Sequence, residues 1–343
     1  MIIHLILNIF INSVFSFLTI VLLIYALLFL FRIKNQRVIY CALMLPFIKL
    51  ITDIFYLNFS TWTFLKGINP YFLQEGTRRL DAQIGLNALY LPKFSIQFFS
   101  IPNHWSFSIG DLLLLKCPFE LKLFLLVVLL FGCVVSMLKC TQKIHNQRRW
   151  EKKVCMQSKV VDPCVFDSRL RKVIEKRKVE VLFFEKIHVP VVFGMFRPKL
   201  ILPEGFFSKY SQEEQNAILA HELKHVVWFD ILTAYFVTII CHLFWFIPLI
   251  ARIKKHVFFH RELACDMGAI KQGCNKKILV KAILKTLDRP KFSLAMSFNQ
   301  THHMILRLET LLKIKKTYFF EILLICVFGG FLLAILLGKF WIF

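Results

Sequence analysis

Three stretches of mostly apolar residues constrain this chain most, because each is long enough, at about 20 residues, to cross a membrane as a helix. They are residues 8–31, 121–138 and 318–337. A fourth, 38–57, is interrupted by Pro46, Lys49 and Asp53. Lys49 and Asp53 either neutralise one another inside a helical bundle or both lie among lipid headgroups. With 57% hydrophobic residues and a mean hydropathy of +0.62, the chain is more hydrophobic than an ordinary soluble domain. The sequence predicts a multi-pass α-helical membrane protein.

The positions of basic residues predict its orientation. Arg32, Lys34 and Arg37 follow the first span, whereas only His4 precedes it, so the N-terminus is expected outside. Residues 1–57 would then hold two membrane helices, 58–119 an external loop and 120–138 a third membrane helix. Residues 139–317 would lie in the cytosol, and 318–343 would form a last membrane helix that places the C-terminus outside.

The net charge of +23 is concentrated after the third span, where residues 139–178 hold thirteen Lys or Arg against four Asp or Glu. One interpretation is attraction to DNA or to a DNA-bound repressor. The favoured one is a juxtamembrane segment held against anionic lipid, because no nucleic-acid-binding module accompanies it. Direct contact with nucleic acid is therefore not expected.

A His-Glu-x-x-His motif at 221–225 predicts the chemistry. Histidines four apart on a helix share one face, so His221 and His225 can both reach one zinc ion. Glu222 is then placed to take a proton from a water molecule activated by that ion. Residues Ser211 to Glu214 match the capping-box pattern, which predicts that a helix begins there and carries the motif.

A catalytic zinc site needs a third protein ligand and leaves one position open. Glu262 is the predicted third ligand. Asp266, four residues later, shares its helical face and would either orient a ligating histidine or bind the metal directly. His260, two residues before Glu262, could reach the site or face solvent, and we favour solvent.

The charge-free segment 231–250 conflicts with this site. If it crossed the membrane once, Glu262 would emerge on the side opposite the histidines, and a return within residues 251–261 would expose unpaired backbone and charges to lipid. We therefore expect the segment not to span: it dips and turns near residues 241–242, or it packs as a buried helix with Pro248 near its end. Residues 276–316 are expected to be helical, with a break at Arg289 and Pro290.

Together these residues resemble the BlaR/MecR-type membrane zinc metallopeptidases, antirepressor sensor-transducers. Besides the motif, the resemblance is carried by residues 189–194, 197–203, 214–225 and 261–266. It implies a bacterial cell-membrane protein with a cytosolic α+β, gluzincin-like zincin domain that cleaves itself and a cytosolic DNA-binding repressor. Well-known members carry a penicillin-binding sensor after the last membrane helix. This chain ends at Phe343, so that sensor is expected to be lacking.

The predicted function is hydrolysis of a protein substrate, whose backbone is held as an added strand by Val191, Val192 and Phe193 or by residues 199–202. Two other functions stay open: a membrane quality-control protease of broader specificity, and a signal transducer without catalysis. The glutamate at 222 argues against the latter, because a purely structural zinc site does not need it. Homodimer formation is also left open.

Overall fold

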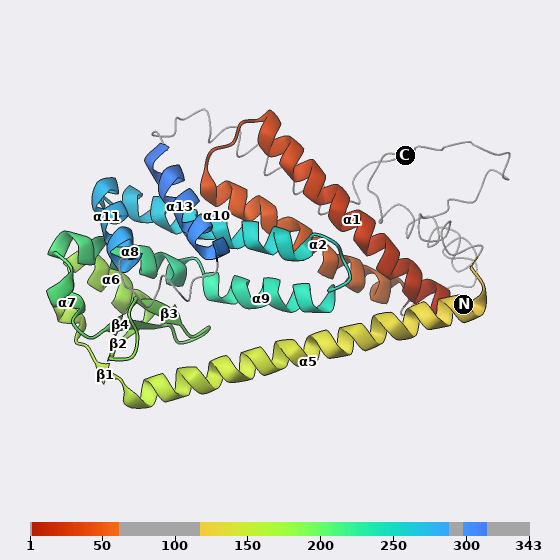
Figure 1. Ribbon diagram of the computed structural model, residues 1–343, viewed down its shortest axis with the longest axis horizontal. Coiled ribbons are helices and arrows are strands. Elements are labelled where there is room, and N and C mark those ends of the chain that lie inside the picture. Colours follow the sequence, from red (N-terminus) through yellow and green to blue (C-terminus); the bar gives the residue numbers. More distant parts are fainter. Residues whose placement is uncertain (1, 62–116, 288–297, 314–343) are drawn as a thin grey trace, which may run out of the picture.

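The computed structural model describes residues 2–61, 117–287 and 298–313 (Figure 1). Over these residues the fold is mostly helical, with one small sheet at one end. Most of the predicted external loop and all of the predicted last span, 318–337, lie outside the described residues.

The first two helices form a hairpin. Helix α1 (Ile2–Leu30) and helix α2 (Gln36–Thr61) pack through buried residues such as Phe17 and Phe47, whose rings meet edge to face at 5.7 Å between centroids. Lys49 is buried on α2, which favours its place within the bundle over the headgroup region. The side chain of Asp53, its predicted partner, lies outside the described residues.

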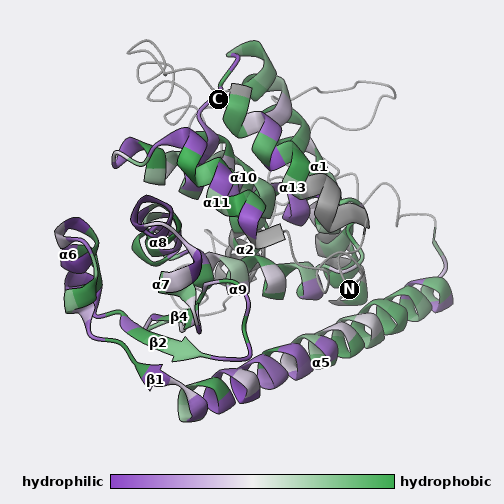
Figure 2. Ribbon diagram, turned by 60° about the vertical axis from the view of Figure 1, so that its left-hand side comes forward, coloured by the Kyte–Doolittle hydropathy of each residue, from purple (hydrophilic) through white to green (hydrophobic). Residues whose placement is uncertain are grey.

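Helix α5 (Phe119–Gln157) runs along the length of the molecule, from beside the N-terminus to the sheet (Figure 1). Its 39 residues correspond to about 58 Å at the usual helical rise. Its colour changes from apolar to polar along the axis (Figure 2). The helix therefore continues well past residue 138, because residues 139–157 contain neither Gly nor Pro.

Two described helices are long and apolar enough to cross a membrane: α1, over Ser13–Leu30, and α5. A third candidate arises only if helices α8 (Gln212–Val227) and α9 (Asp230–Leu243), which meet at 57°, are taken as one broken span. Exposed apolar side chains are numerous on the first half of α5, where they would face lipid: Phe119, Leu121, Leu123, Phe124, Val127, Leu130, Phe131 and Val134.

The sheet has four strands in the order β1-β2-β4-β3. Strands β1 (Lys159–Val160) and β3 (Val191–Phe193) are the edges. Strand β4 (Lys199–Pro203) pairs parallel to β2 (Glu180–Phe184) and antiparallel to β3. A short 3-10 helix η2 (Pro163–Val165) and helix α6 (Ser168–Arg177) connect β1 to β2, and helix α7 (Phe206–Lys209) follows β4.

Both faces of the sheet are covered by other elements. Successive side chains of a strand point to opposite faces, so each face presents apolar residues. On one face, Val181 and Leu200 pack with α6 and with helix α8 (Gln212–Val227). On the other, Leu182 and Ile201 pack with Val154 at the end of α5.

The apolar segment 231–250 does not form one long helix. Helix α9 (Asp230–Leu243) ends after 14 residues, about 21 Å, which is less than the thickness of a bilayer core. The chain turns through residues 244–249, slightly later than the predicted 241–242, and returns as helix α10 (Ile250–Lys271). Both helices pack against α1 and α2 in one core (Figure 1).

The remaining described helices are α11 (Lys276–Leu287) and α13 (Phe298–Lys313). Helix α11 is described as far as Leu287, and the predicted break at Arg289 and Pro290 lies outside the described residues.

Candidate metal centre

The His-Glu-x-x-His motif lies on α8, and the predicted capping box begins that helix. Glu214 donates its backbone N–H to Ser211 Oγ at 3.4 Å, and Ser211 donates its own to Glu214 Oε2 at 3.0 Å. One turn apart on the helix, His221 and His225 point the same way, with their Nε2 atoms 3.3 Å apart.

The return of α10 brings Glu262 to these histidines. Its Oε2 atom lies 3.6 Å from His221 Nε2 and 3.7 Å from His225 Nε2. The close approach of α10 to α8 depends on Gly268, where a Cβ would collide with the Trp228 ring and the Lys224 chain. The turn after α9 thus brings the predicted third ligand beside the histidines despite the apolar segment between them in sequence.

The three donor atoms fit one metal ion. Donors held about 2.1 Å from a tetrahedral zinc ion lie about 3.4 Å from one another. The observed separations of 3.3, 3.6 and 3.7 Å are close to that value. Two imidazoles and a carboxylate are also a donor set that zinc accepts at catalytic sites.

A buried carboxylate lies behind each histidine. Asp266 Oδ1 is 2.8 Å from His221 Nδ1, and Asp230 Oδ2 is 2.8 Å from His225 Nδ1. Both contacts are made to the ring nitrogen that faces away from the donor triangle. Of the two roles considered for Asp266, this geometry favours orienting the ligand over binding the metal.

A second group of possible ligands consists of His225, Asp230 and Cys265. The Cys265 Sγ atom lies 3.3 Å from His225 Nδ1 and 3.2 Å from Asp230 Oδ2. Burial raises the pKa of this thiol to about 12, so it remains protonated and donates to the carboxylate. We therefore assign these contacts to the support of His225.

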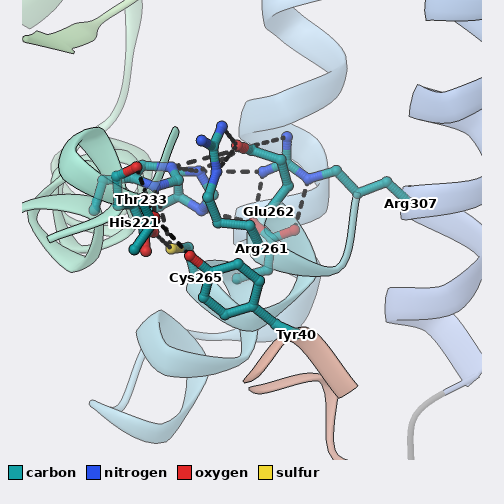
Figure 3. Close-up of polar contacts among 10 residues, drawn as sticks. Tyr40, His221, Thr233, Arg261, Glu262, Cys265 and Arg307 are labelled. Atoms are coloured by element: carbon teal, nitrogen blue, oxygen red, sulfur yellow. Dashed lines mark hydrogen bonds and ion pairs between the residues drawn. The ribbon is translucent and has the colours of Figure 1, made fainter. Parts of the chain in front are cut away.

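Cations surround the acidic side chains. Arg261 Nη2 lies 2.8 Å from Glu262 Oε1, and Arg307 of α13 binds Asp266 (Figure 3). Burial alone would raise the pKa of Glu262, but the neighbouring His225, His221 and Arg261 outweigh it and hold that pKa well below its usual range. Glu262 is therefore present as a carboxylate.

Glu222 lines a groove of about 470 Å³ together with His225 and Glu262. Burial raises the pKa of Glu222, although the two histidines oppose the shift. The groove lies between the peptidase helices, strand β3 and a face of α5, and its α5 wall consists of Cys140, Lys143, Ile144 and Gln147.

Strand β3 forms the other wall of the groove. Val191 is exposed, Val192 is half-buried, and Phe193 is buried against the Trp150 ring at 5.9 Å between centroids. Because β3 is an edge strand that lines the groove, its outer backbone groups are unpaired within the sheet, whereas β4, the other strand predicted to hold substrate, is paired on both sides.

Residues 116–311 match the BlaR1 peptidase M56 family. This chain belongs to that family. The regulatory protein BlaR1 of Bacillus licheniformis is 32% identical over 120 residues, which are 33% of this chain and 18% of that protein. The methicillin resistance mecR1 protein of Staphylococcus aureus is 26% identical over 96 residues, 28% of this chain and 16% of the relative. The aligned stretches span less than a fifth of either relative.

Membership of the M56 family confirms the resemblance predicted from the motifs. With its apolar helices, the chain is a membrane protein of metallopeptidase type, and its relative BlaR1 is named a regulatory protein.

Sequence reasoning missed Asp230 and Arg307. No spacing rule points to Asp230, because its contact with His225 depends on the abrupt bend between α8 and α9. Arg307 carried a signal: Met304, Leu308 and Leu311 place it on the apolar face of α13, where an arginine needs a buried partner.

Proposed function

We propose that this protein is an integral-membrane zinc endopeptidase that hydrolyses a protein substrate at the cytosolic face. One observation carries the proposal: the two histidines of α8 and the Glu262 carboxylate of α10 meet at metal-binding distances. They do so beside Glu222, in a groove bordered by the edge strand β3. A structural metal site would need neither Glu222 nor the groove.

His221, His225 and Glu262 would hold the metal. When bound, zinc would polarise the scissile carbonyl and lower the pKa of a water molecule toward about 7. Glu222 would take a proton from that water and deliver it to the leaving amine, which keeps the number of protons balanced over the cycle. The raised pKa of Glu222 suits a group that both accepts and donates a proton.

The substrate would lie extended along β3, with its backbone hydrogen-bonded to the outer edge formed by Val191, Val192 and Phe193. This mode restricts cleavage to segments that can leave their own fold. The name of the relative BlaR1, a regulatory protein, favours a cytosolic transcriptional repressor, this chain itself, or both as the substrate.

Comparison of new protein termini in cells with the parent chain or Glu222→Gln tests this function. We expect the variant to retain bound zinc and to lose all cleavage that depends on the parent, whereas His221→Ala should lose both zinc and cleavage. Cleavage confined to one or two proteins would support the regulatory role, and many unrelated membrane fragments would support quality control instead. Full proteolysis by purified Glu222→Gln would contradict the proposal.

A further inference from the structure

Helix α13 supplies none of the three proposed ligands, yet it sends one charged side chain into the site. Met304, Leu308 and Leu311 pack with α10 and α11 in a small core. Arg307 lies on that same face of the helix, and only 13% of its side chain is exposed. An arginine placed among apolar neighbours needs fixed acceptors.

Its acceptor is Asp266, whose side chain is fully buried. Arg307 Nε donates to Asp266 Oδ2 at 2.6 Å, and Arg307 Nη2 donates to Asp266 Oδ1 at 2.7 Å. This paired contact fixes the plane and the direction of the carboxylate, which a single ammonium group cannot do.

The same Asp266 Oδ1 atom lies 2.8 Å from His221 Nδ1. A carboxylate at this distance from Nδ1 favours the tautomer that carries its proton there, which leaves Nε2 unprotonated, as a metal ligand requires. The contact therefore runs from α13 through Asp266 to the ring of His221.

The guanidinium also reaches the donor triangle itself. Arg307 Nη2 lies 3.4 Å from His221 Nε2, and Arg307 Nη1 lies 3.7 Å from Glu262 Oε2. One side chain thus contacts both carboxylates of α10 and the first histidine of α8, which fixes the two helices relative to one another.

We propose that Arg307 is a positioning residue of the metal centre: from α13 it locks Asp266, and through Asp266 it sets the orientation in which His221 binds the metal. This inference rests on the proposed function, because it assumes that a metal binds at the triangle. It makes α13, a helix outside the motif, a determinant of metal affinity.

The test uses Arg307→Lys in the full-length protein purified in detergent. Lysine keeps the positive charge but cannot make the paired contact with Asp266. We expect zinc affinity, measured by competition with a chromophoric chelator, to fall by about tenfold to a hundredfold. The visible spectrum of the Co²⁺-loaded protein should also change, because it reports the ligand geometry at the metal.

Two further variants separate positioning from folding. Asp266→Asn should weaken zinc binding similarly, and the double variant should lose little more, because both changes act on one contact. Arg177→Lys is the matched control. Arg177 is also partly buried and donates to Val227 O at the end of α8, 3.2 Å away, but it does not contact the triangle. It should leave both readouts unchanged.

The outcomes are distinguishable. If Arg307→Lys keeps the parent's affinity and Co²⁺ spectrum, or if its loss adds fully to that of Asp266→Asn, the inference is wrong while the proposed function stands. A shift in thermal midpoint with unchanged affinity would likewise reduce Arg307 to a packing role. A parent protein that binds neither metal would overturn the proposed function and this inference together.

Discussion

At the residue scale, the two histidines are supported differently although both contact a buried aspartate. Asp266 comes from α10 and is held by the arginine of α13, whereas Asp230 begins α9 and accepts from the Cys265 thiol. Tyr40 of α2 reaches the same region, with its hydroxyl 2.7 Å from Thr233 Oγ1 (Figure 3). The metal centre is therefore tied to the α1–α2 hairpin as well as to α13.

Asp230→Asn tests the support of His225. We expect zinc affinity to fall by about tenfold to a hundredfold, because an amide offers His225 a weaker acceptor and can present its N–H₂ group instead. Competition titration of the purified protein measures this. Asp162→Asn is the control, since Asp162 is an exposed acceptor from the Cys164 backbone N–H at the start of η2. Equal zinc affinity in the parent and Asp230→Asn would exclude a role for this carboxylate at the metal.

At the element scale, Glu214 fastens α8 to α11. This buried carboxylate belongs to the capping box and lies 2.6 Å from Lys285 Nζ, but 3.7 Å from Lys281 Nζ. Burial would raise the pKa of Glu214, but the contacts with Lys285 and the Ser211 backbone outweigh it and lower that pKa. The carboxylate is therefore charged in the folded protein at neutral pH.

Lys285→Met should lower the free energy of unfolding by about 1–2 kcal/mol, because it leaves a buried carboxylate without its closest cation. Lys281→Met, on the same helix with a more exposed side chain, should change it by less than about 0.5 kcal/mol. The stabilisation should be present above the ordinary pKa of 4.5 and should disappear as the pH falls through the lowered folded-state pKa. Pulse proteolysis across a urea series at several pH values measures both. Equal losses for the two variants would contradict this account.

The helix that carries the motif was predictable because its signals are local: a capping box, an apolar run and two histidines at helical spacing. The position of β4 between β2 and β3 was not predictable. The strand order β1-β2-β4-β3 depends on long-range pairing that no short motif encodes. The same limit hid Asp230 and Arg307, which reach the centre only after α9 and α13 have packed.

His260 was expected to face solvent, but it lies partly buried with its Nδ1 2.7 Å from Gln36 Oε1. The prediction was wrong because α10 packs against α2, a long-range contact that no local pattern indicates.

At the scale of the whole molecule, the turn between α9 and α10 lies beside the apolar half of α5. Cys133 Sγ lies 3.4 Å from Leu243 O, and Ser136 Oγ lies 2.9 Å from His242 Nδ1. The Trp245 ring fills the space where Gly132 lacks a side chain. Residues 121–138 form a predicted span. The hairpin of α9 and α10 beside it would therefore enter the apolar layer from the peptidase side and return to that same side.

Gly132→Leu should disrupt this arrangement, because the added side chain would occupy the space of the Trp245 ring. Displacement of the hairpin would move Glu262 away from the histidines, so we expect weaker zinc binding at a site whose ligands lie 89 to 130 positions away in sequence. Trp245→Ala in the same chain should restore part of the affinity by vacating the space. Leu130→Ala, an exposed position two residues earlier, is the control and should bind zinc as the parent does. If Gly132→Leu alone leaves zinc affinity intact, the contact does not position the site.

The orientation of the hairpin can be tested by cysteine accessibility in intact cells. Lys255 on α10 and Lys152 on the polar half of α5 are exposed, so a cysteine at either should react with a membrane-impermeant maleimide only after the cells are opened. A cysteine at Glu120, exposed at the start of α5, should react from outside. The exposed Cys41 and Cys164 are first replaced by serine to lower the background.

Labelling of Lys255→Cys from outside, with Lys152→Cys still protected, would mean that residues 231–250 cross the membrane. In that case Glu262 could not share an aqueous compartment with His221 and His225, because a polar return through lipid would cost more than the site could stabilise.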